Sequence, residues 1–587
     1  MAYASLRECI DDLERAGRLR AIDAPLDADL EVAAVHRRVF AAGGPALLFR
    51  NVRGSRFPLA SNLFGTKERA YYILRHGLEA ARAAIAARVS PRDLVRRPRA
   101  AASLPGALAH ALPRIVRSAP SLAIASRIAD LPRVRAWPRD GGPFVTLPLV
   151  YTEHPDAAGF AQSNLGMYRV QLSGNEYVLN REVGLHYQIH RGIGVHQAAA
   201  EARGEALRVN VFVGGVPAMT LAAVLPLPEG VPEVVFAGVL AGRATRFARA
   251  ERGPAVYADA DFVIRGEIAR GVLKPEGPFG DHLGYYSEAH PFPVLRVESV
   301  THRDDAIWPF TVVGRPPQED SVFGELVHEL FGAAVASVVP GVRDVHAVDE
   351  AGVHPLLLAI GSERYAPYLP TKRPMELLTQ ANAILGQGQM SLAKYLFIVD
   401  GAGAPGLRAR DVPAFFAHLL ERFDPTRDLH FQTNTTIDTL DYSGTALNEG
   451  SKLVLAACGE KKRTLGTRAP APARLAMPGV LVVEDARDVE KLPLDGFPLV
   501  VVADDADFTT RSLANFLWVT FTRSDPARDV HGVGELVRDK AWGCTGSVII
   551  DARIKPGHAP ALEEDPAVTK RIESLAVRGG PLAGLFE

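Results

Sequence analysis

Cysteine is scarce in this chain, and its scarcity excludes several kinds of site. Among 587 residues there are only three cysteines, Cys9, Cys458 and Cys544, which lie far apart and form no CxxC pair. Such a set excludes a disulfide framework and a zinc site made of cysteines. We therefore expect a protein of a reducing compartment.

An excess of one charge and a long apolar run are also missing. The net charge is −1 and the isoelectric point is about 7.0, so the composition does not favour nucleic acid, and no nucleic-acid motif is present. No apolar run approaches the roughly 18 residues of a membrane-spanning helix. Charged residues occupy the N-terminal stretch where a signal peptide would be apolar. The expected location is cytoplasmic, with no membrane span and no nucleic-acid partner.

The patterns that are present indicate a multidomain α/β (α+β) protein. A chain of 587 residues is too long for one hydrophobic core. Ser5 and Glu8 form a capping-box pattern that predicts a helix over 5–16, and a second helix is expected over 29–41, ahead of an apolar strand. Residues 1–140 are thus expected to form an N-terminal α/β domain.

Residues 76–140 differ in composition from the rest of this domain. They contain 12 arginines, no lysine and four acids, with proline and alanine-rich pieces between them. We expect an inserted helical segment whose arginines either cover an acidic neighbour or face solvent. A specific anion site there is the less favoured alternative.

Two further domains are expected after residue 140. Residues 141–315 contain short alternating runs separated by glycine and asparagine turns, which predict a barrel or a sandwich. Residues 316–587 return to the α/β pattern, with an extension at the C-terminal end. No internal repeat and no low-complexity tract is found.

Two segments contain candidates for catalysis and for binding a cation or a carboxylate. In PEGPFGDHLGYY (275–286), Glu276 and Asp281 flank a turn and are either solvated or a general acid/base pair. In SNLGMYR, the amide oxygen of Asn164 suits a hard cation and Arg169 suits a carboxylate. The alternative for the second segment is an ordinary turn followed by a solvated arginine.

Three other segments suggest a metal and a phosphate. His190, Arg191 and Gly192 end an apparent strand, where glycine-rich backbone could approach a phosphate, although a structural histidine in a turn is the simpler alternative. Glu233 begins a predicted helix, where it either complements the helix dipole or supplies a metal ligand. Mixed nitrogen and oxygen ligands suit Mn²⁺ or Mg²⁺. Lys394 interrupts an apolar strand, as an edge lysine or as the partner of a buried anion.

In their order along the chain, these segments resemble the UbiD family of decarboxylases, which includes the ferulic-acid decarboxylases. The segments that carry the resemblance are NLGMYR (164–169), HRGIG (190–194), PEVVFAG (232–238), EGPFGDHLGYY (276–286), GRPPQEDS (314–321), AKYLFIVD (393–400), FDPTRDLHFQTNTTIDTLDY (423–442) and EGSKLVLAACGEKKR (449–463). The resemblance implies a central split β-barrel that binds prenylated FMN and a C-terminal α/β domain used for oligomerisation.

The resemblance also implies a role for each matching residue. Arg169, Glu276 and Asp281 would form the catalytic network, with Asp281 as a proton donor of raised pKa, and Lys394 would meet the cofactor phosphate. His282 receives no role. The implied ligands of Mn²⁺ (or Mg²⁺) are Asn164, His190 and Glu233; the implied K⁺ ligands are Glu233 and the carbonyls of Ala222 and Leu225; and the implied cofactor pocket includes Met167, Arg169, Arg191 and Gly192.

The expected reaction is reversible non-oxidative decarboxylation of an aromatic or α,β-unsaturated carboxylic acid. The expected partners are this small-molecule substrate, a flavin prenyltransferase that supplies the cofactor, and a second copy of the chain in a homodimer or larger homo-oligomer. Two alternatives remain: a UbiD-like subunit without activity of its own, and an ordinary FMN redox protein. An apolar, ring-sized substrate pocket is expected from Pro316, Pro317, Phe323, Leu440 and Tyr442.

Overall fold

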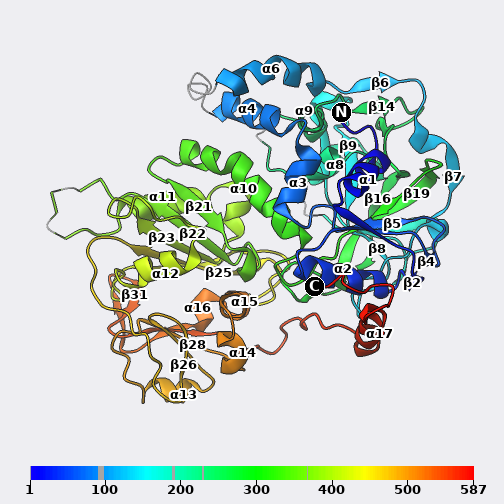
Figure 1. Ribbon diagram of the computed structural model, residues 1–587. Helices are drawn as coiled ribbons and strands as arrows, with labels where there is room; N and C mark the ends of the chain where they lie inside the picture. The colour runs from blue at the N-terminus through cyan, green and yellow to red at the C-terminus, as the bar shows by residue number, and fades with distance from the viewer. Residues whose placement is uncertain (1, 90–97, 188–191, 228–229, 367, 370) are drawn as a thin grey trace.

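The computed structural model describes residues 2–89, 98–187, 192–227, 230–366, 368–369 and 371–587 (Figure 1). The predicted Ser5 cap is present, since the Ser5 hydroxyl accepts from the Glu8 N–H, while the Glu8 carboxylate accepts from the N–H of Ala4 rather than that of Ser5. The N-terminal elements are α1 (Leu6–Arg15), β1 (Leu19–Ile22), β2 (Leu26–Asp27), α2 (Glu31–Ala41), β3 (Ala46–Phe49), β4 (Val52–Arg53), β5 (Leu59–Ser61) and α3 (Lys67–Leu74). Strands β1, β3 and β5 form one sheet with β20 (Trp308–Pro309).

Within the described residues, the arginine-rich segment has α-helices only in its first half. Helices α4 (Leu78–Val89) and α6 (Pro98–Ala111) pack against α9 (Glu233–Ala241), as Figure 1 shows. After them, β6 (Arg114–Val116) pairs with β14 (Arg246–Ala248), and β7 (Ile124–Ser126) extends the central sheet. The helical expectation is therefore wrong for this second half, because its short apolar runs add strands to existing sheets.

A nine-stranded sheet dominates the central domain. Its order is β10-β9-β13-β16-β19-β12-β11-β8, and β7 also pairs with β19. The bounds are β8 (Phe144–Val145), β9 (Pro148–Glu153), β10 (Ser163–Gly166), β11 (Val170–Gln171), β12 (Glu182–Leu185), β13 (Arg208–Val213), β16 (Phe262–Glu276) and β19 (His290–His302). Within the described residues, no pairing joins β10 to β8, so the path is open where a closed barrel would seal it.

Shorter elements surround this sheet, and some of them contain candidate site residues. They are α7 (Gly192–Ala202), α8 (Pro217–Ala222), α9, β14, β15 (Val256–Tyr257) and the hairpin of β17 (Phe279–Gly280) and β18 (Tyr286–Ser287). The long strands β16 and β19 pair along their length, up to the pair Glu276–His290. The sheet therefore delivers Glu276 to one end of its longest strand.

The C-terminal region contains two units with the same topology. In the first, β21 (Asp344–Ala347) and β24 (Leu429–Thr436) are antiparallel edges of a parallel core of β22 (Leu356–Gly361), β23 (Tyr395–Asp400) and β25 (Glu449–Ala457). In the second, β26 (Arg474–Met477) and β29 (Val530–Gly532) are antiparallel edges of a parallel core of β27 (Val480–Val483), β28 (Leu499–Val502) and β32 (Val548–Asp551).

The remaining elements are α10 (Glu319–Val338), α11 (Glu376–Leu385), α12 (Val412–Leu420), α13 (Ala486–Val489), α14 (Ala506–Thr510), α15 (Leu513–Thr522), α16 (Pro526–Asp529), β30 (Glu535–Arg538), β31 (Ala541–Cys544) and α17 (Pro566–Ala576).

The two units also share sequence, so the expectation of no internal repeat is wrong. Residues 411–430 align without gaps to 512–531, with seven of 20 positions identical, including the pattern R-x-D-P-x-R-D-x-H. Asp411 and Ser512 cap α12 and α15 in the same way. The Asp424 N–H donates to the Asp428 carboxylate at 2.8 Å, and the equivalent bond from Asp525 to Asp529 is 2.7 Å. We call these units repeat 1 (344–457) and repeat 2 (474–551).

The repeats bury equivalent faces against each other (Figure 1). Tyr395 and Phe397 of β23 and Leu499 and Val501 of β28 all enter one shared core, in which α12 and α15 also lie. The ring of Phe521 is fully buried there, with its centroid 5.0 Å from Tyr395 and 5.8 Å from Phe397. Contact through the same patch on both copies is the geometry of a two-fold dimer.

This shared core predicts that the two repeats unfold together. Phe521→Ala should lower the free energy of unfolding by about 3–5 kcal/mol, the usual cost of deleting a buried phenyl ring. Amide hydrogen exchange should accelerate in β23 as well as in β28. Phe508→Ala removes a half-buried ring of repeat 2 and should cost less. Faster exchange confined to repeat 2 in Phe521→Ala would contradict a common core.

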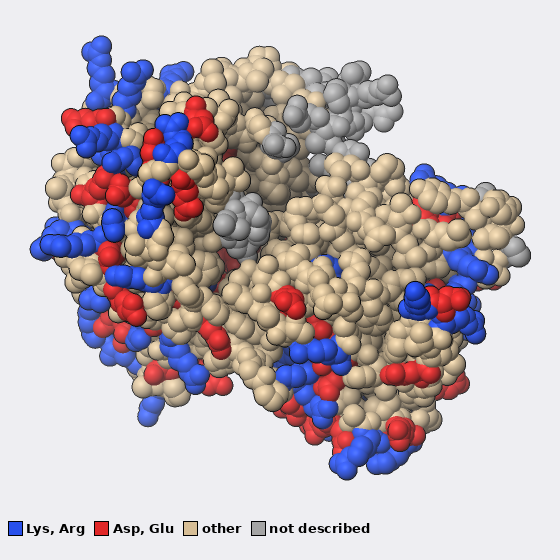
Figure 2. All heavy atoms as spheres, turned by 180° about the vertical axis from the view of Figure 1, so that it is seen from behind, with Lys and Arg blue, Asp and Glu red and all other residues tan. Residues whose placement is uncertain are grey.

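The chain end returns to the N-terminal domain. In Figure 1, α17 lies beside α2. Glu564, just before α17, pairs with Arg37 at 3.0 Å and with Arg38 at 2.9 Å. Figure 2 shows charges of both signs interspersed on the face opposite to that of Figure 1, without a broad field of one sign. In the part of the chain that the structure covers, no helix is long and apolar enough to span a membrane.

Candidate active site

Arg169 joins the two acids of the predicted catalytic network. Its Nε and Nη2 donate to the two carboxylate oxygens of Glu276 at 2.9 and 2.8 Å, a bidentate pair. Its Nη1 donates to Oδ2 of Asp281, and Nη2 also donates to the Ser287 hydroxyl at 2.8 Å. The Glu276 side chain is fully buried, and those of Arg169 and Asp281 are each 10% exposed. The predicted juxtaposition of these three residues is present.

The turn between the two acids is fastened on several sides. Gly277 has a φ of +95°, which favours glycine, and its N–H donates to the Gln171 side chain at 2.9 Å. The Gly280 N–H donates to the buried Asp140 carboxylate at 2.8 Å. A Cβ at Gly280 would lie 2.1 Å from the Trp137 ring, so only glycine fits. These contacts fix the positions of Glu276 and Asp281 relative to Arg169.

The electrostatics of the two acids differ from the expectation for one of them. Burial alone would raise the pKa of Glu276, but the Arg169 charge and the bonds from His186 and Arg169 lower it to about 2. Burial likewise opposes ionisation of Asp281, yet the hydrogen bond from His282 and the Arg169 charge lower the pKa of that carboxyl too. The expected raised pKa of Asp281 is wrong, since both acids are ionised in this arrangement.

Two histidines complete the site. Nδ1 of His186 lies 3.0 Å from Glu276 Oε2, and its ring stacks on Phe292 with the centroids 4.0 Å apart. Nδ1 of His282 lies 3.0 Å from Asp281 Oδ1. His282, for which no role was expected, therefore contacts the predicted proton donor directly. The only sequence signal for His282 is its position next to Asp281, because its other neighbours come from distant elements.

Asn164 and Glu233 lie together where a cation would be held. The Glu233 carboxylate accepts from the N–H of Leu165, the residue after Asn164, at 3.1 Å. Burial raises the pKa of Glu233 to about 7, and the buried Nδ2 of Asn164 has no hydrogen-bond partner within the described residues. The carboxylate of Glu233 and the amide oxygen of Asn164 are the kind of ligands that a divalent cation prefers, whereas the unpaired Nδ2 can donate only to an acceptor such as a phosphate oxygen. His190 and Arg191, predicted for this site, lie outside the described residues.

Gly192 is the first residue of α7 rather than the end of a strand. A Cβ there would lie 2.2 Å from Oδ1 of Asn164, so a side chain at this position would displace the predicted ligand. The first N–H groups of a helix have no partner inside that helix and favour an anion such as a phosphate at its N-terminus. The structure therefore places Gly192 against the predicted cation site.

The other predicted ligands lie in the chain segments around α8. The Met167 N–H donates to the carbonyl of Ala223 at 3.3 Å. The carbonyls of Ala222 and Leu225 each accept one hydrogen bond within a local turn, and each keeps a second lone pair. Their role as K⁺ ligands stays a prediction.

Lys394 is not available to a cofactor phosphate in this structure. It precedes β23, a central strand, so it is not an edge lysine. Its ammonium pairs with Asp441 at 2.8 Å and donates to the Ser443 hydroxyl at 2.6 Å and the Ser524 carbonyl at 2.9 Å. These three contacts use all three of its protons. The predicted phosphate contact is therefore corrected: Lys394 joins repeat 1 to repeat 2.

The comparisons with known proteins match this architecture. Family models of the 3-octaprenyl-4-hydroxybenzoate carboxy-lyases match residues 10–89 (N-terminal domain), 116–316 (Rift-related domain) and 321–457 (C-terminal domain). The fold and the site thus define an enzyme of the carboxy-lyase class. The chain belongs to the UbiD family of decarboxylases.

Similar proteins span nearly the whole chain. An uncharacterised protein of Chlamydia trachomatis is 36% identical over 97% of this chain and 98% of its own length. A protein of Chlamydia pneumoniae, named as a subunit of 4-hydroxybenzoate decarboxylase, is 37% identical over 97% of both chains. Repeat 2 lies beyond the C-terminal family model but inside the span that these relatives cover.

Solved structures share the fold at lower identity. Vanillic acid decarboxylase of Sedimentibacter hydroxybenzoicus in its closed form has a TM-score of 0.66 and 20% identity, over 84% of this chain and 98% of that one. The UbiD-class enzyme HmfF of Pelotomaculum thermopropionicum, in complex with FMN, has a TM-score of 0.61 and 24% identity, over 80% of this chain and 97% of that one. An evolved dimeric form of HmfF, in complex with prFMN, has a TM-score of 0.59 and 23% identity, over 80% of this chain and 97% of that one.

Proposed function

We propose that this enzyme catalyses the reversible, non-oxidative decarboxylation of an aromatic or α,β-unsaturated carboxylic acid with prenylated FMN. The observation that carries the proposal is the buried clamp of Arg169 on both Glu276 and Asp281. The names of the similar proteins, with vanillic acid, 4-hydroxybenzoate, FMN and prFMN among them, support it. The aromatic acids are preferred.

The residues of the clamp have separate tasks. A guanidinium carries five N–H groups, and four of those of Arg169 are used by Glu276, Asp281 and Ser287. Within the described residues the remaining one, on Nη1, has no hydrogen-bond partner, and it would be available to a substrate carboxylate beside Asp281. Glu276, held ionised by Arg169 and His186, fixes the orientation of the clamp. Asp281 delivers the proton that replaces the lost carboxylate on the substrate carbon.

The cofactor and metals would occupy the neighbouring cradle. Asn164, His190 and Glu233 would hold Mn²⁺ or Mg²⁺, with K⁺ at Glu233, Ala222 and Leu225, and with Met167, Arg191 and Gly192 lining the flavin phosphate region. Bound prenylated FMN supplies an electron sink for the bond to the departing CO₂. A flavin prenyltransferase would provide it, and a homodimer or larger homo-oligomer in the cytoplasm stays our expectation.

The direct test is turnover by a cofactor-loaded protein. The chain should be co-expressed with a flavin prenyltransferase and its bound flavin identified by mass and absorption. Hydroxybenzoates and cinnamate-type acids should then be screened for CO₂ release and, in D₂O, for deuterium at the vacated carbon. Loaded protein that is inactive on all of these acids would contradict the proposal and favour the accessory subunit. Tightly bound, unmodified FMN after co-expression would favour an ordinary flavoprotein.

Replacing Glu233 should remove the metal. In Glu233→Gln the neutral amide is a weaker ligand, and we expect the Mn²⁺ content per chain to fall at least about tenfold. The flavin content should be retained. Elemental analysis and flavin absorption measure both quantities. Glu205→Gln, an exposed acid after α7, is the control and should retain both. Full Mn²⁺ content in Glu233→Gln would refute the predicted ligand set.

A further inference from the structure

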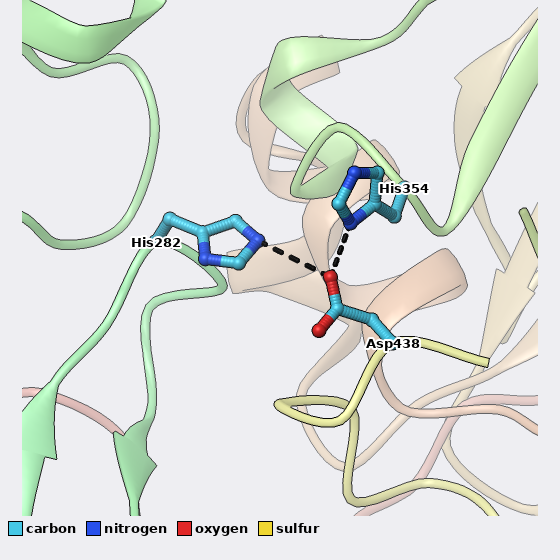
Figure 3. Close-up of side chains that lie close together, drawn as sticks. All are labelled: His282, His354 and Asp438. Carbon is cyan, nitrogen blue, oxygen red and sulfur yellow. Dashed lines mark hydrogen bonds and ion pairs between the residues drawn. The ribbon is translucent and has the colours of Figure 1, made fainter. Parts of the chain in front are cut away.

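A second group of side chains lies behind Asp281. Figure 3 shows His282 and His354 each aiming one ring nitrogen at the same oxygen, Oδ2, of Asp438. His354 makes a direct hydrogen bond to it through Nδ1, and Nε2 of His282 is 3.8 Å away. The other Asp438 oxygen accepts from the Leu440 N–H at 2.9 Å. Asp438 is thereby fixed facing His282.

This group connects two domains to the catalytic acid. His282 lies in the β17–β18 hairpin of the central domain, His354 precedes β22, and Asp438 follows β24. The other ring nitrogen of His282, Nδ1, is 3.0 Å from Oδ1 of Asp281. A continuous row of ionisable groups therefore runs from Arg169 through Asp281 and His282 to Asp438 and His354.

The proton that Asp281 delivers has to come from another group. Asp281 must give up a proton in each turnover, yet Arg169 and His282 hold it as a carboxylate. Within the described residues, the guanidinium of Arg169 and the imidazole of His282 are the side chains bonded to this carboxylate. Arginine does not release its proton in proteins. Only the imidazole of this pair can do so near neutral pH.

We propose that His282 supplies the proton that Asp281 delivers to the substrate, with Asp438 and His354 holding the imidazole in place. The proposal rests on the proposed function. His282 does not reach the reacting carbon, so it acts through Asp281 as a positioning and supply residue.

The proton passes along two groups in order. His282 gives its Nδ1 proton to Oδ1 of Asp281, and Asp281 gives a proton to the carbon whose bond to CO₂ has broken. The electron pair of that broken bond becomes the new C–H bond. The His282 side chain is 21% exposed, so water can return a proton to it. One proton is consumed for each CO₂ released.

The charges around His282 favour its protonated form. Burial acts against the cation, but the hydrogen bond to Asp281 and the charges of Asp281, Asp438 and Asp320 raise its pKa to about 9. Asp320 lies on α10 and Asp349 lies beside it, so acids face the ring from three separate segments. His354 is the other titratable ring that packs on it. Proton supply should thus persist through neutral pH and fail as the pH rises through about 9.

A bound cation is the competing explanation of the same cluster. One ligand atom each of His282, His354 and Asp438 lies within 4.8 Å of the others. However, both rings point at the carboxylate oxygen itself rather than at a common empty centre (Figure 3). The direct bond between His354 and Asp438 already uses that oxygen. The hydrogen-bonded arrangement therefore accounts for the geometry without an ion.

The first test does not depend on activity. In protein labelled at histidine Cε1, NMR titration should identify the His282 signal by its loss in His282→Gln. Its midpoint should lie well above 6.5 in the wild type and fall by at least one pH unit in Asp438→Asn. His346→Gln, on β21 and away from the site, is the control and should leave the His282 midpoint unchanged. A midpoint unchanged by Asp438→Asn would overturn the proposal, as would one equivalent of Zn²⁺ bound by wild type but not by His354→Asn.

The second test uses deuterium incorporation by the loaded enzyme. His282→Gln should lose at least tenfold in rate while keeping its flavin, and Asp438→Asn should move the alkaline loss of activity to lower pH. A wild-type pH profile in His282→Gln would overturn the supply role alone. A loaded wild type with a shifted His282 midpoint but no decarboxylation would instead refute the proposed function, and the supply role with it.

Discussion

Glu276→Gln is expected to reduce decarboxylation at least about a hundredfold, the scale of a misplaced group that orients the substrate. Glutamine preserves the size of the side chain but removes the charge that holds the Arg169 guanidinium flat against it. Arg169 would then be free to turn fully toward Asp281. The measurement is the rate of CO₂ release at saturating substrate by protein with a full complement of flavin. Asp281→Asn should lose a similar factor because it removes the proton donor.

The matched control for Glu276→Gln is on the same hairpin. Glu288 is exposed, and its backbone N–H, rather than its carboxylate, bonds to Tyr442. Glu288→Gln should therefore retain near-normal turnover. If Glu276→Gln with bound flavin matched this control, the clamp would not be the catalytic network.

Removing Arg169 should lower both the stability and the activity of the protein. Arg169→Met leaves two buried carboxylates without their cation, and breaking a buried ion pair in this way typically costs about 3–5 kcal/mol. Denaturant unfolding at pH 7.5 measures the loss. Turnover should also fall by at least about a hundredfold, because the group that binds the substrate carboxylate is gone.

The pH dependence of this loss identifies its cause. In the wild type, Glu276 has a pKa of about 2, below its ordinary value of 4.5, so its contribution to stability is full above pH 4.5 and is lost toward pH 2. In Arg169→Met, burial would raise the pKa of both acids, so they would protonate in mild acid. The loss of unfolding free energy relative to the wild type should thus be smaller at pH 5.5 than at pH 7.5. Arg208→Met, which breaks a partly exposed surface pair with Glu298, should cost under about 1 kcal/mol at both pH values.

Local sequence rules predicted the parts of the fold that depend on neighbours in the chain. The helix capped by Ser5 and the helix at Glu233 are present where expected. The family resemblance identified Arg169, Glu276 and Asp281, and these residues do meet. In each of these cases the information is either local or contained in the order of the motifs.

Features that depend on distant partners were not predictable in this way. The sequence indicated that Lys394 could pair with a buried anion but did not identify that anion, because Asp441 and Ser524 lie far along the chain. The expected pKa of Asp281 was wrong because the sequence does not reveal that His282 bonds to it. The repeat escaped detection because its copies are about 100 residues apart and keep mainly their capping and turn residues.

Joining the two repeats in one polypeptide changes how their contact depends on concentration. Two separate subunits that meet through such a face fall apart on dilution, but copies on one chain have a local concentration on the order of millimolar. The contact between repeat 1 and repeat 2, including Phe521 and the Lys394–Ser524 bond, should therefore persist at any protein concentration. Because this face is already occupied within the chain, a homo-oligomer would have to assemble through other surfaces.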